Sequence, residues 1–232
     1  MKILALDSAT GACSVALWQD GAVVARRFAT MDRGQSEVLI PMAREVLAEA
    51  GADFPSIDMF GVTTGPGAFT GLRIGLAAAR GMALASGRPL AGVSTFDAVA
   101  HGLPAGEREG RSVLVAVESR REDIFIQWFD IKLIPVGEAR SVRPEDLVLP
   151  DTPVLVAGDG AARLHSLFGV STGKERMATN RDVRFASGEG FPDAADVARL
   201  IALRGADAAA TAPPQPFYLR PPDVTLPAGK VR

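Results

Sequence analysis

The sequence predicts an α/β fold of two small domains that repeat one order of elements. A continuous apolar run ending in an acidic residue opens the chain at Ile3–Asp7, and a second such run occurs at Val113–Glu118. A short turn and a further strand pattern follow each run. Later in each half, a strand leads directly into a Gly-x-Gly-Ala sequence and a helix. These matching orders indicate an internal duplication.

Three strands are expected at the start of the first half. Ile3–Asp7 is apolar up to its last residue, which is typical of a strand buried on both faces. A second strand is expected at Cys13–Trp18 and a third at Ala22–Phe28. The Asp-Gly pair between them is a strong hairpin signal, so we expect these two strands to form a hairpin.

Two long helices are expected after these strands. The first occupies Ser36–Ala50, begins at an N-cap serine and repeats apolar residues every three to four positions. A strand at Ile57–Thr63 then runs into a glycine-rich loop, and the second helix follows at Thr70–Ala85. A strand at Leu90–Val93 and a helix near Thr95–Ala100 complete this half.

A polar, Pro- and Gly-rich stretch around Leu103–Gly110 predicts the boundary between domains at 1–104 and 111–204. Residues 205–232 are expected to be a linker and a tail. The elements expected in the second domain are strands at Val113–Glu118, Asp123–Phe129 and Val154–Ala157, a helix through Phe168, and a helix at Asp193–Leu203.

Composition narrows the class of protein. The net charge is −2, whereas a protein that held RNA alone would usually have a basic surplus, so any RNA contact is expected to be local or delegated. The single cysteine, Cys13, excludes an intrachain disulfide. The opening apolar run is too short for a signal peptide, and no run reaches the ~18 residues that span a bilayer. We therefore expect a soluble, cytoplasmic protein with no membrane contact.

No metal site and no catalytic residue are predicted. The two histidines, His101 and His165, lie far apart, and neither begins an H-x-x-x-H pattern. Cys13 belongs to no C-x-x-C pair, and it lies inside a predicted strand with no base nearby in the sequence. We expect it to be a buried structural thiol.

The loop from Gly65 to Gly75 is the sharpest local signal. Glycines let a backbone approach a phosphate or another chain, and the following helix start offers free N–H groups. The spacing completes neither standard nucleotide motif. Actin-like ATPases place an acid where Asp7 closes the first strand, although a turn-capping role for Asp7 is the alternative. The candidate vestigial nucleotide-binding residues are Asp7, Ser8, Gly65 and Gly67.

Small residues recur every four positions in the second long helix, so one of its faces is nearly flat. Such a face permits close approach of another element. Two alternatives stay open: the face packs on its own sheet, or it associates with another chain. The candidate interface residues are Val38, Met42, Val46, Gly71, Leu72, Gly75, Ala79 and Met82.

Three segments resemble the TsaB (YeaZ) family: Ile3–Ser8, Gly65–Gly75 and Pro216–Arg220. The order of elements fits from the N-terminus to about Arg220. The resemblance implies a duplicated actin-like (ASKHA, ribonuclease-H-like) α/β fold. The chain departs from the family pattern at Gln35-Ser36, where members often have His-Ser, and in the turn after Glu118.

The resemblance also implies a function. Family members are non-catalytic subunits that dimerise with a TsaD-like catalytic subunit. That subunit transfers threonylcarbamoyl to the adenosine next to the anticodon of tRNAs that read codons beginning with A. A TsaE-like ATPase joins the complex, and ATP and a metal ion are expected in the partner subunits rather than in this chain. The resemblance is compatible with a homodimer when the chain is alone and with tRNA contact through the complex.

Two other functions stay open. One is an ATP-dependent small-molecule kinase or ATPase of the actin-like superfamily, for which Gly158-Asp159-Gly160-Ala161 is a minimal adenosine-site candidate. The other is a peptidase, which is an older label of the family. The sequence offers neither a metal pair nor a nucleophile constellation for that activity.

Overall fold

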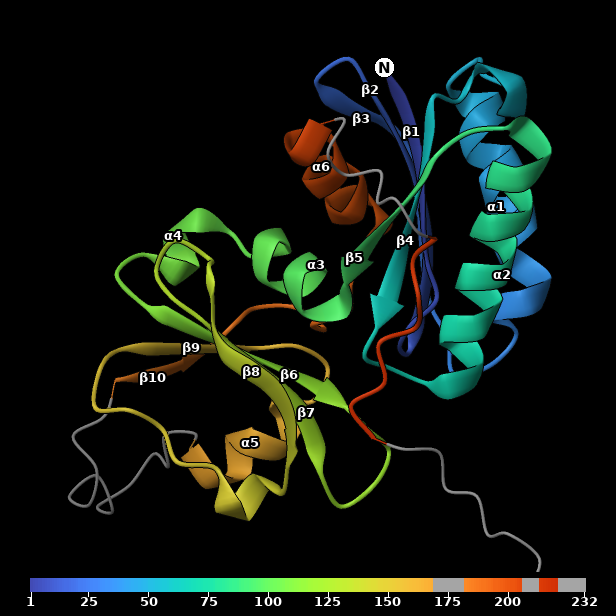
Figure 1. Cartoon of the computed structure of the whole chain (residues 1–232). Coiled ribbons are helices and arrows are strands. Elements are labelled where there is room, and N and C mark those ends of the chain that lie inside the picture. Colours follow the sequence, from blue (N-terminus) through green and yellow to red (C-terminus); the bar gives the residue numbers. More distant parts are fainter. Residues whose placement is uncertain (169–181, 206–212, 221–232) are drawn as a thin grey trace, which may run out of the picture.

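The computed structural model describes residues 1–168, 182–205 and 213–220, which form two five-stranded sheets (Figure 1). The strands of the first sheet are β1 (Lys2–Asp7), β2 (Ala12–Gln19), β3 (Ala22–Thr30), β4 (Met59–Gly65) and β5 (Leu90–Ser94). Those of the second are β6 (Ser112–Glu118), β7 (Ile124–Phe129), β8 (Pro135–Val142), β9 (Val154–Ala157) and β10 (Val183–Phe185).

The two sheets have the same topology. Their strand orders are β3-β2-β1-β4-β5 and β8-β7-β6-β9-β10. In each sheet the first three strands pair antiparallel, and the last two run parallel to the first strand. The repeat confirms the predicted duplicated actin-like α/β fold. Strands β8 and β10 were not expected, because β8 is a largely exposed edge strand that contains Pro and Gly and β10 has only three residues.

Helices α1 (Gln35–Glu49) and α2 (Phe69–Ser86) cover one face of the first sheet (Figure 1). The chain enters α1 through Gly34, whose φ of 93° suits glycine, and no side chain caps the helix. The predicted serine cap is therefore not used. The other short elements are η1 (Phe54–Ser56), α4 (Ala105–Arg108), η2 (Pro144–Asp146) and α5 (Ala161–Phe168).

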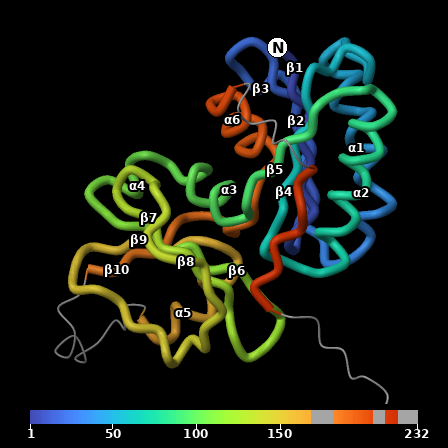
Figure 2. The backbone as a smooth tube through the Cα atoms, in the orientation of Figure 1, coloured from blue at the N-terminus to red at the C-terminus, as the bar shows by residue number. Residues whose placement is uncertain are grey.

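Two helices pack on the sheet of the other half. Phe96 and Val99 of α3 (Thr95–Gly102) join the core above β6, whereas Val197 and Ile201 of α6 (Ala194–Arg204) pack on β1 and β2. Figure 2 shows α6, near the end of the chain, beside the N-terminal strands. The spatial units are therefore not the contiguous stretches 1–104 and 111–204 predicted from the sequence.

Residues 213–220, which we call the strap, pack along both halves (Figure 1). The Phe217 N–H donates to the carbonyl of Thr64 at 2.7 Å, and Arg220 Nη2 lies 2.5 Å from Asp123 Oδ1 in the second half. The expectation that 205–232 is only linker and tail is therefore wrong for the strap. The rest of that range, 206–212 and 221–232, lies outside the described residues.

Candidate functional site

The glycine-rich loop after β4 lies directly against the turn between β1 and β2. The Ala68 N–H donates to the Ala9 carbonyl at 2.7 Å. A Cβ on Gly67 would lie 2.1 Å from the Ala9 carbonyl oxygen, and one on Gly71 would lie 2.2 Å from that of Ser8. Only glycine permits such an approach. The glycines therefore let two segments of this chain pack in direct backbone contact.

Asp7 is sealed beneath this contact. Its side chain is fully buried, and its Oδ1 accepts hydrogen bonds from the Thr63 hydroxyl at 2.5 Å and the Ala9 N–H at 3.1 Å. Oδ2 is buried with no partner in the described part of the chain. Burial raises the pKa of Asp7 to about 7, although the two hydrogen bonds oppose that shift. Asp7 thus has the turn contact that the capping alternative predicted.

The other candidate nucleotide residues also face inward. The Ser8 hydroxyl donates to the Gly71 carbonyl at 2.9 Å. Gly65 has a left-handed φ of 113°, and a Cβ there would lie 2.8 Å from the Phe217 carbonyl oxygen of the strap. The structure brings Asp7, Ser8, Gly65 and Gly67 together, but as packed backbone and buried side chains.

The second half repeats this turn with its acid more exposed. Glu118 Oε1 accepts from the N–H two residues later, as Asp7 Oδ1 does, and Gly158 has a φ of 99° at the position equivalent to Gly65. The paired acids expected from the duplication are therefore present. Glu118, however, is half-exposed and lies 3.1 Å from Arg163 Nη1.

The predicted interface residues divide into two groups. The half-buried ones are Val38, Met42 and Met82. The buried ones are Val46, Gly71, Leu72, Gly75 and Ala79. The buried group cannot meet another chain, so its assignment to an interface is wrong and the packing alternative holds for the small face. Successive residues of a helix are ~100° apart around its axis. Gly71, Gly75 and Ala79 therefore lie beside Leu72 and Leu76 and face the core with them.

The opposite side of α2 is also lined by small and apolar residues, and we call it the outer helix face. Leu84 is 85% exposed, and a Cβ on Gly81 would meet nothing within 4 Å. The face consists of Ile74, Ala77, Ala78, Gly81, Met82, Leu84 and Ala85. Next to it, α1 contributes the exposed Ile40 and the half-buried Val38 and Met42. Sequence reasoning found only Met82 of this face, although Ala77, Gly81 and Ala85 have the same four-residue spacing.

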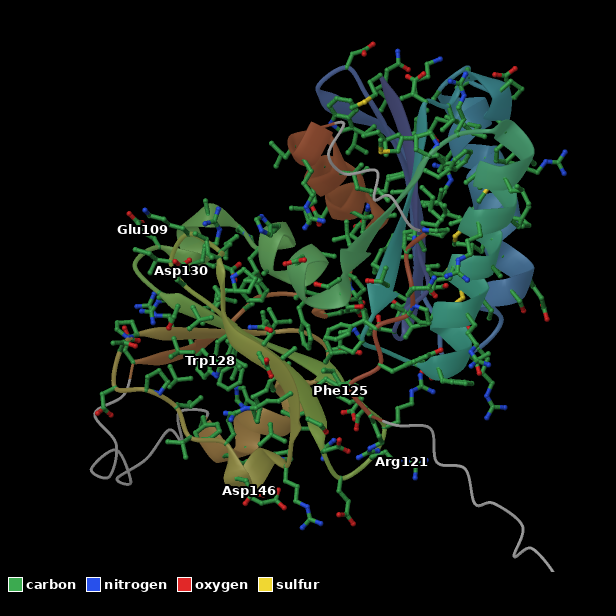
Figure 3. The ribbon with its side chains drawn as sticks, in the orientation of Figure 1. Glu109, Arg121, Phe125, Trp128, Asp130 and Asp146 are labelled. Atoms are coloured by element: carbon green, nitrogen blue, oxygen red, sulfur yellow. The ribbon has the colours of Figure 1, made fainter. Side chains whose placement is uncertain are left out.

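A cleft of about 820 Å³ opens at the N-terminal ends of α1 and α2. Its walls come from residues 32–36, the start of α2, the turn after β6, and the strap. Figure 3 shows Arg121 and Phe125 on the side of the second half that meets the strap. The arginines that line the cleft are Arg33, Arg73, Arg120, Arg121 and Arg220.

Aromatic side chains form part of the same cleft. The rings of Phe69 and Tyr218 stack with centroids 5.6 Å apart, and they are 49% and 39% exposed. The guanidinium carbon of Arg73 lies 3.7 Å from the Phe69 centroid, and its Nε donates to the Tyr218 hydroxyl at 3.2 Å. The cleft thus presents a fixed aromatic and guanidinium surface to solvent.

Few side chains are suited to covalent or metal chemistry. Burial raises the pKa of the Cys13 thiol to about 12, so a thiolate nucleophile is disfavoured there. Among the described residues, no three His, Cys, Asp or Glu side chains are grouped to hold a metal ion. The expectation of no bound metal stays a prediction. No helix in the described ranges is long and apolar enough to cross a bilayer.

These features define a protein of duplicated actin-like α/β fold whose glycine-rich loop packs against the turn after its first strand. Residues 25–138 match the model of the family described as TsaD, tRNA N6-adenosine threonylcarbamoyltransferase. The chain is 40% identical to Escherichia coli tRNA threonylcarbamoyladenosine biosynthesis protein TsaB over 126 residues, which cover 54% of this chain and 53% of that protein. The match therefore spans about half the length of that relative.

Two further comparisons extend the likeness. The chain is 32% identical to an uncharacterized protein of Mycobacterium tuberculosis over 158 residues, covering 67% of this chain and 71% of that one. The structure of YeaZ from Pseudomonas aeruginosa is 28% identical and superimposes with a TM-score of 0.76, covering 94% of this chain and 99% of that one. The chain belongs to the TsaB (YeaZ) family.

Proposed function

We propose that this chain is the non-catalytic partner subunit required for threonylcarbamoyl transfer to the adenosine next to the anticodon of tRNAs that read codons beginning with A. Its E. coli relative is named as a biosynthesis protein of that modified nucleoside. The observation that carries the proposal is the packed glycine loop, whose Ala68 N–H already donates to the Ala9 carbonyl and whose spacing completes neither standard nucleotide motif. The reaction chemistry is then supplied by another subunit.

The proposed partner is a TsaD-like catalytic subunit. The TsaD family model matches residues 25–138, which include α1 and α2, so the partner is expected to carry an equivalent helix pair. Two equivalent helix pairs can pack about a pseudo-twofold axis, and small exposed residues let the helix axes approach closely. We therefore place the contact on the outer helix face, together with Val38 and Met42.

The rest of the assembly follows from the family. ATP and the metal ion are proposed to bind in the partner subunits, with a TsaE-like ATPase joining the complex in the cytoplasm. Without a partner, the same outer helix face would pair two copies of this chain. The alternatives have less support: the glycine-rich loop completes neither standard nucleotide motif that a kinase or ATPase would use, and the buried Cys13 does not provide the reactive nucleophile of a cysteine peptidase.

The test compares two arginine substitutions at glycines with open space around them, Gly81→Arg on the outer helix face and Gly106→Arg on α4. We expect both variants to keep the wild-type circular dichroism spectrum. Gly81→Arg should lose co-elution with the TsaD-like subunit on size exclusion, whereas Gly106→Arg should retain it. A folded Gly81→Arg that still co-elutes would contradict the proposed contact.

The same pair tests the cellular role. Mass spectrometry of digested tRNA should show loss of threonylcarbamoyladenosine when this protein is depleted, with recovery by Gly106→Arg and not by Gly81→Arg. A normal level of the modified nucleoside after complete depletion would contradict the proposed function outright.

A further inference from the structure

We propose that the arginine-lined cleft binds the sugar-phosphate backbone of a single-stranded RNA segment, so that this subunit contacts tRNA directly. The identity of the RNA rests on the proposed function. The chemistry of the cleft, as a site for a phosphate-bearing strand with exposed bases, rests on the geometry of its walls.

The cleft concentrates positive charge that the chain as a whole does not have, since the net charge is −2. Arg33 has no ion-pair partner within the described ranges. Arg120 lies 3.6 Å from Asp32, a carboxylate whose side chain is 92% exposed. A pair this open to water adds little stability and leaves the guanidinium available to a ligand. Guanidinium groups suit phosphate because they present paired N–H donors.

Backbone donors add to this charge. Residues 34–36 and 67–71 line the cleft at the starts of α1 and α2, and neither helix has a side-chain N-cap. The Glu37 and Ala68 N–H groups are bonded to the carbonyls of Gly34 and Ala9, whereas the first N–H groups of each helix have no side-chain cap and favour an anion. Phosphates along one wall can meet helix termini as well as arginines.

The aromatic pair distinguishes RNA from other anionic partners. Phe69 and Tyr218 expose ring surface next to Arg73. A groove that combines positive charge with exposed aromatic rings is typical of single-stranded nucleic acid binding, because phosphates follow the charge and bases stack on the rings. An acidic polypeptide would use the arginines but would not need the stacking surface.

The experiment measures binding of the full chain, without partner subunits, to fluorescently labelled unmodified tRNA between about 50 and 200 mM salt. Arg33→Gln/Arg73→Gln is the test variant. Arg140→Gln, an exposed β8 residue outside the cleft, is the matched control. On a single strand, each arginine that contacts a phosphate contributes about 0.7 unit to the slope of log affinity against log salt. We expect the double variant to lose about 1.4 units and Arg140→Gln to keep the wild-type slope.

A second variant separates stacking from charge. Phe69→Leu should weaken binding about tenfold with little change in the salt slope, because it removes ring surface but no charge. Unchanged affinity and slope in the double variant would overturn the proposal, as would no binding of the wild type at the lowest salt. Displacement of the RNA by ATP would indicate a mononucleotide site instead, and equal displacement by polyglutamate an acidic protein partner.

The two proposals fail separately. The RNA titration uses this chain alone, whereas co-elution with the TsaD-like subunit tests the proposed function. RNA binding that depends on Arg33 and Arg73, together with no partner binding, would overturn only the proposed function. Partner binding with an unchanged salt slope in the double variant would overturn only the RNA site.

Discussion

The two halves of the molecule share one order of elements, but the acidic residue that ends the first strand of each half lies in a different environment. In the first half, Asp7 is sealed under the Gly65–Gly71 loop. In the second half, the equivalent Glu118 is half-exposed, and the turn after it supplies Arg120 to the cleft. Both acids accept a hydrogen bond from the N–H two residues later. The hydrogen bond of the turn is therefore the same in both halves. The side chains and the neighbouring loop determine that the turn after β1 is buried and that the turn after β6 is exposed.

A similar contrast holds between the two sides of α2. Both sides carry small residues at four-residue spacing, but Gly71 and Gly75 of the inner set lie against Ser8, whereas the outer set faces solvent. Small residues alone therefore do not identify an interface. The distance to the nearest backbone atom distinguishes the two sides.

The largest expected effect comes from adding one methyl group to each side of α2 in turn. Gly71→Ala puts a methyl group 2.2 Å from the Ser8 carbonyl oxygen, so the backbone must shift, and we expect a loss of about 3 kcal/mol or more. Gly81→Ala meets no atom within 4 Å and should gain up to about 1 kcal/mol from helix propensity. Urea unfolding measures both. Equal effects at the two positions would contradict the assignment of the two sides.

The buried acid of the first half should make stability depend on pH. Because the folded pKa of Asp7 is raised to about 7, its contribution is full below the ordinary pKa near 3.8, falls as pH rises, and levels off above about 7. The slope approaches about 1.4 kcal/mol per pH unit. Asp7→Asn should remove this slope and increase stability at pH 7 to 8 by a few kcal/mol, in order of magnitude.

Asp20 provides the control for that experiment. It is exposed, and the N-terminal ammonium lowers its pKa, so its contribution is present above the ordinary pKa and lost as pH falls. Asp20→Asn should therefore change the pH profile in the opposite direction. If Asp7→Asn left the profile between pH 4 and 7 unchanged, Asp7 would not be buried in its neutral form.

The smallest expected effect concerns the strap that joins the halves. Arg220→Ala removes a partner from Asp123, whose side chain is only 9% exposed, and should cost about 1–2 kcal/mol. Arg27→Ala breaks pairs with Glu45 and Glu49 that lie within the first half and are exposed, and should cost less than Arg220→Ala. Thermal unfolding of both variants tests whether the Arg220–Asp123 contact between the halves stabilises the fold more than the Arg27 pairs within the first half.

The sequence by itself determined much of the local structure. Apolar runs and the Asp-Gly turn predicted β1, β2 and β3, and the repeated strand–acid–turn order predicted the duplication that the two sheets confirm. The glycine loop and the Pro216–Arg220 motif identified the family. These features could be read because spacing along one strand or helix, and the backbone needs of a turn, are properties of consecutive residues.

Only the tertiary structure decided which surfaces meet. Periodicity placed Gly71, Gly75 and Ala79 on one side of α2, but it could not say that Ser8 lies against that side. It also could not reveal that α3 and α6 exchange sheets or that the strap spans both halves. The cleft unites Arg33, Arg73, Arg120 and Arg220, which are far apart in the chain. Such contacts depend on how whole elements pack, and no local spacing encodes them.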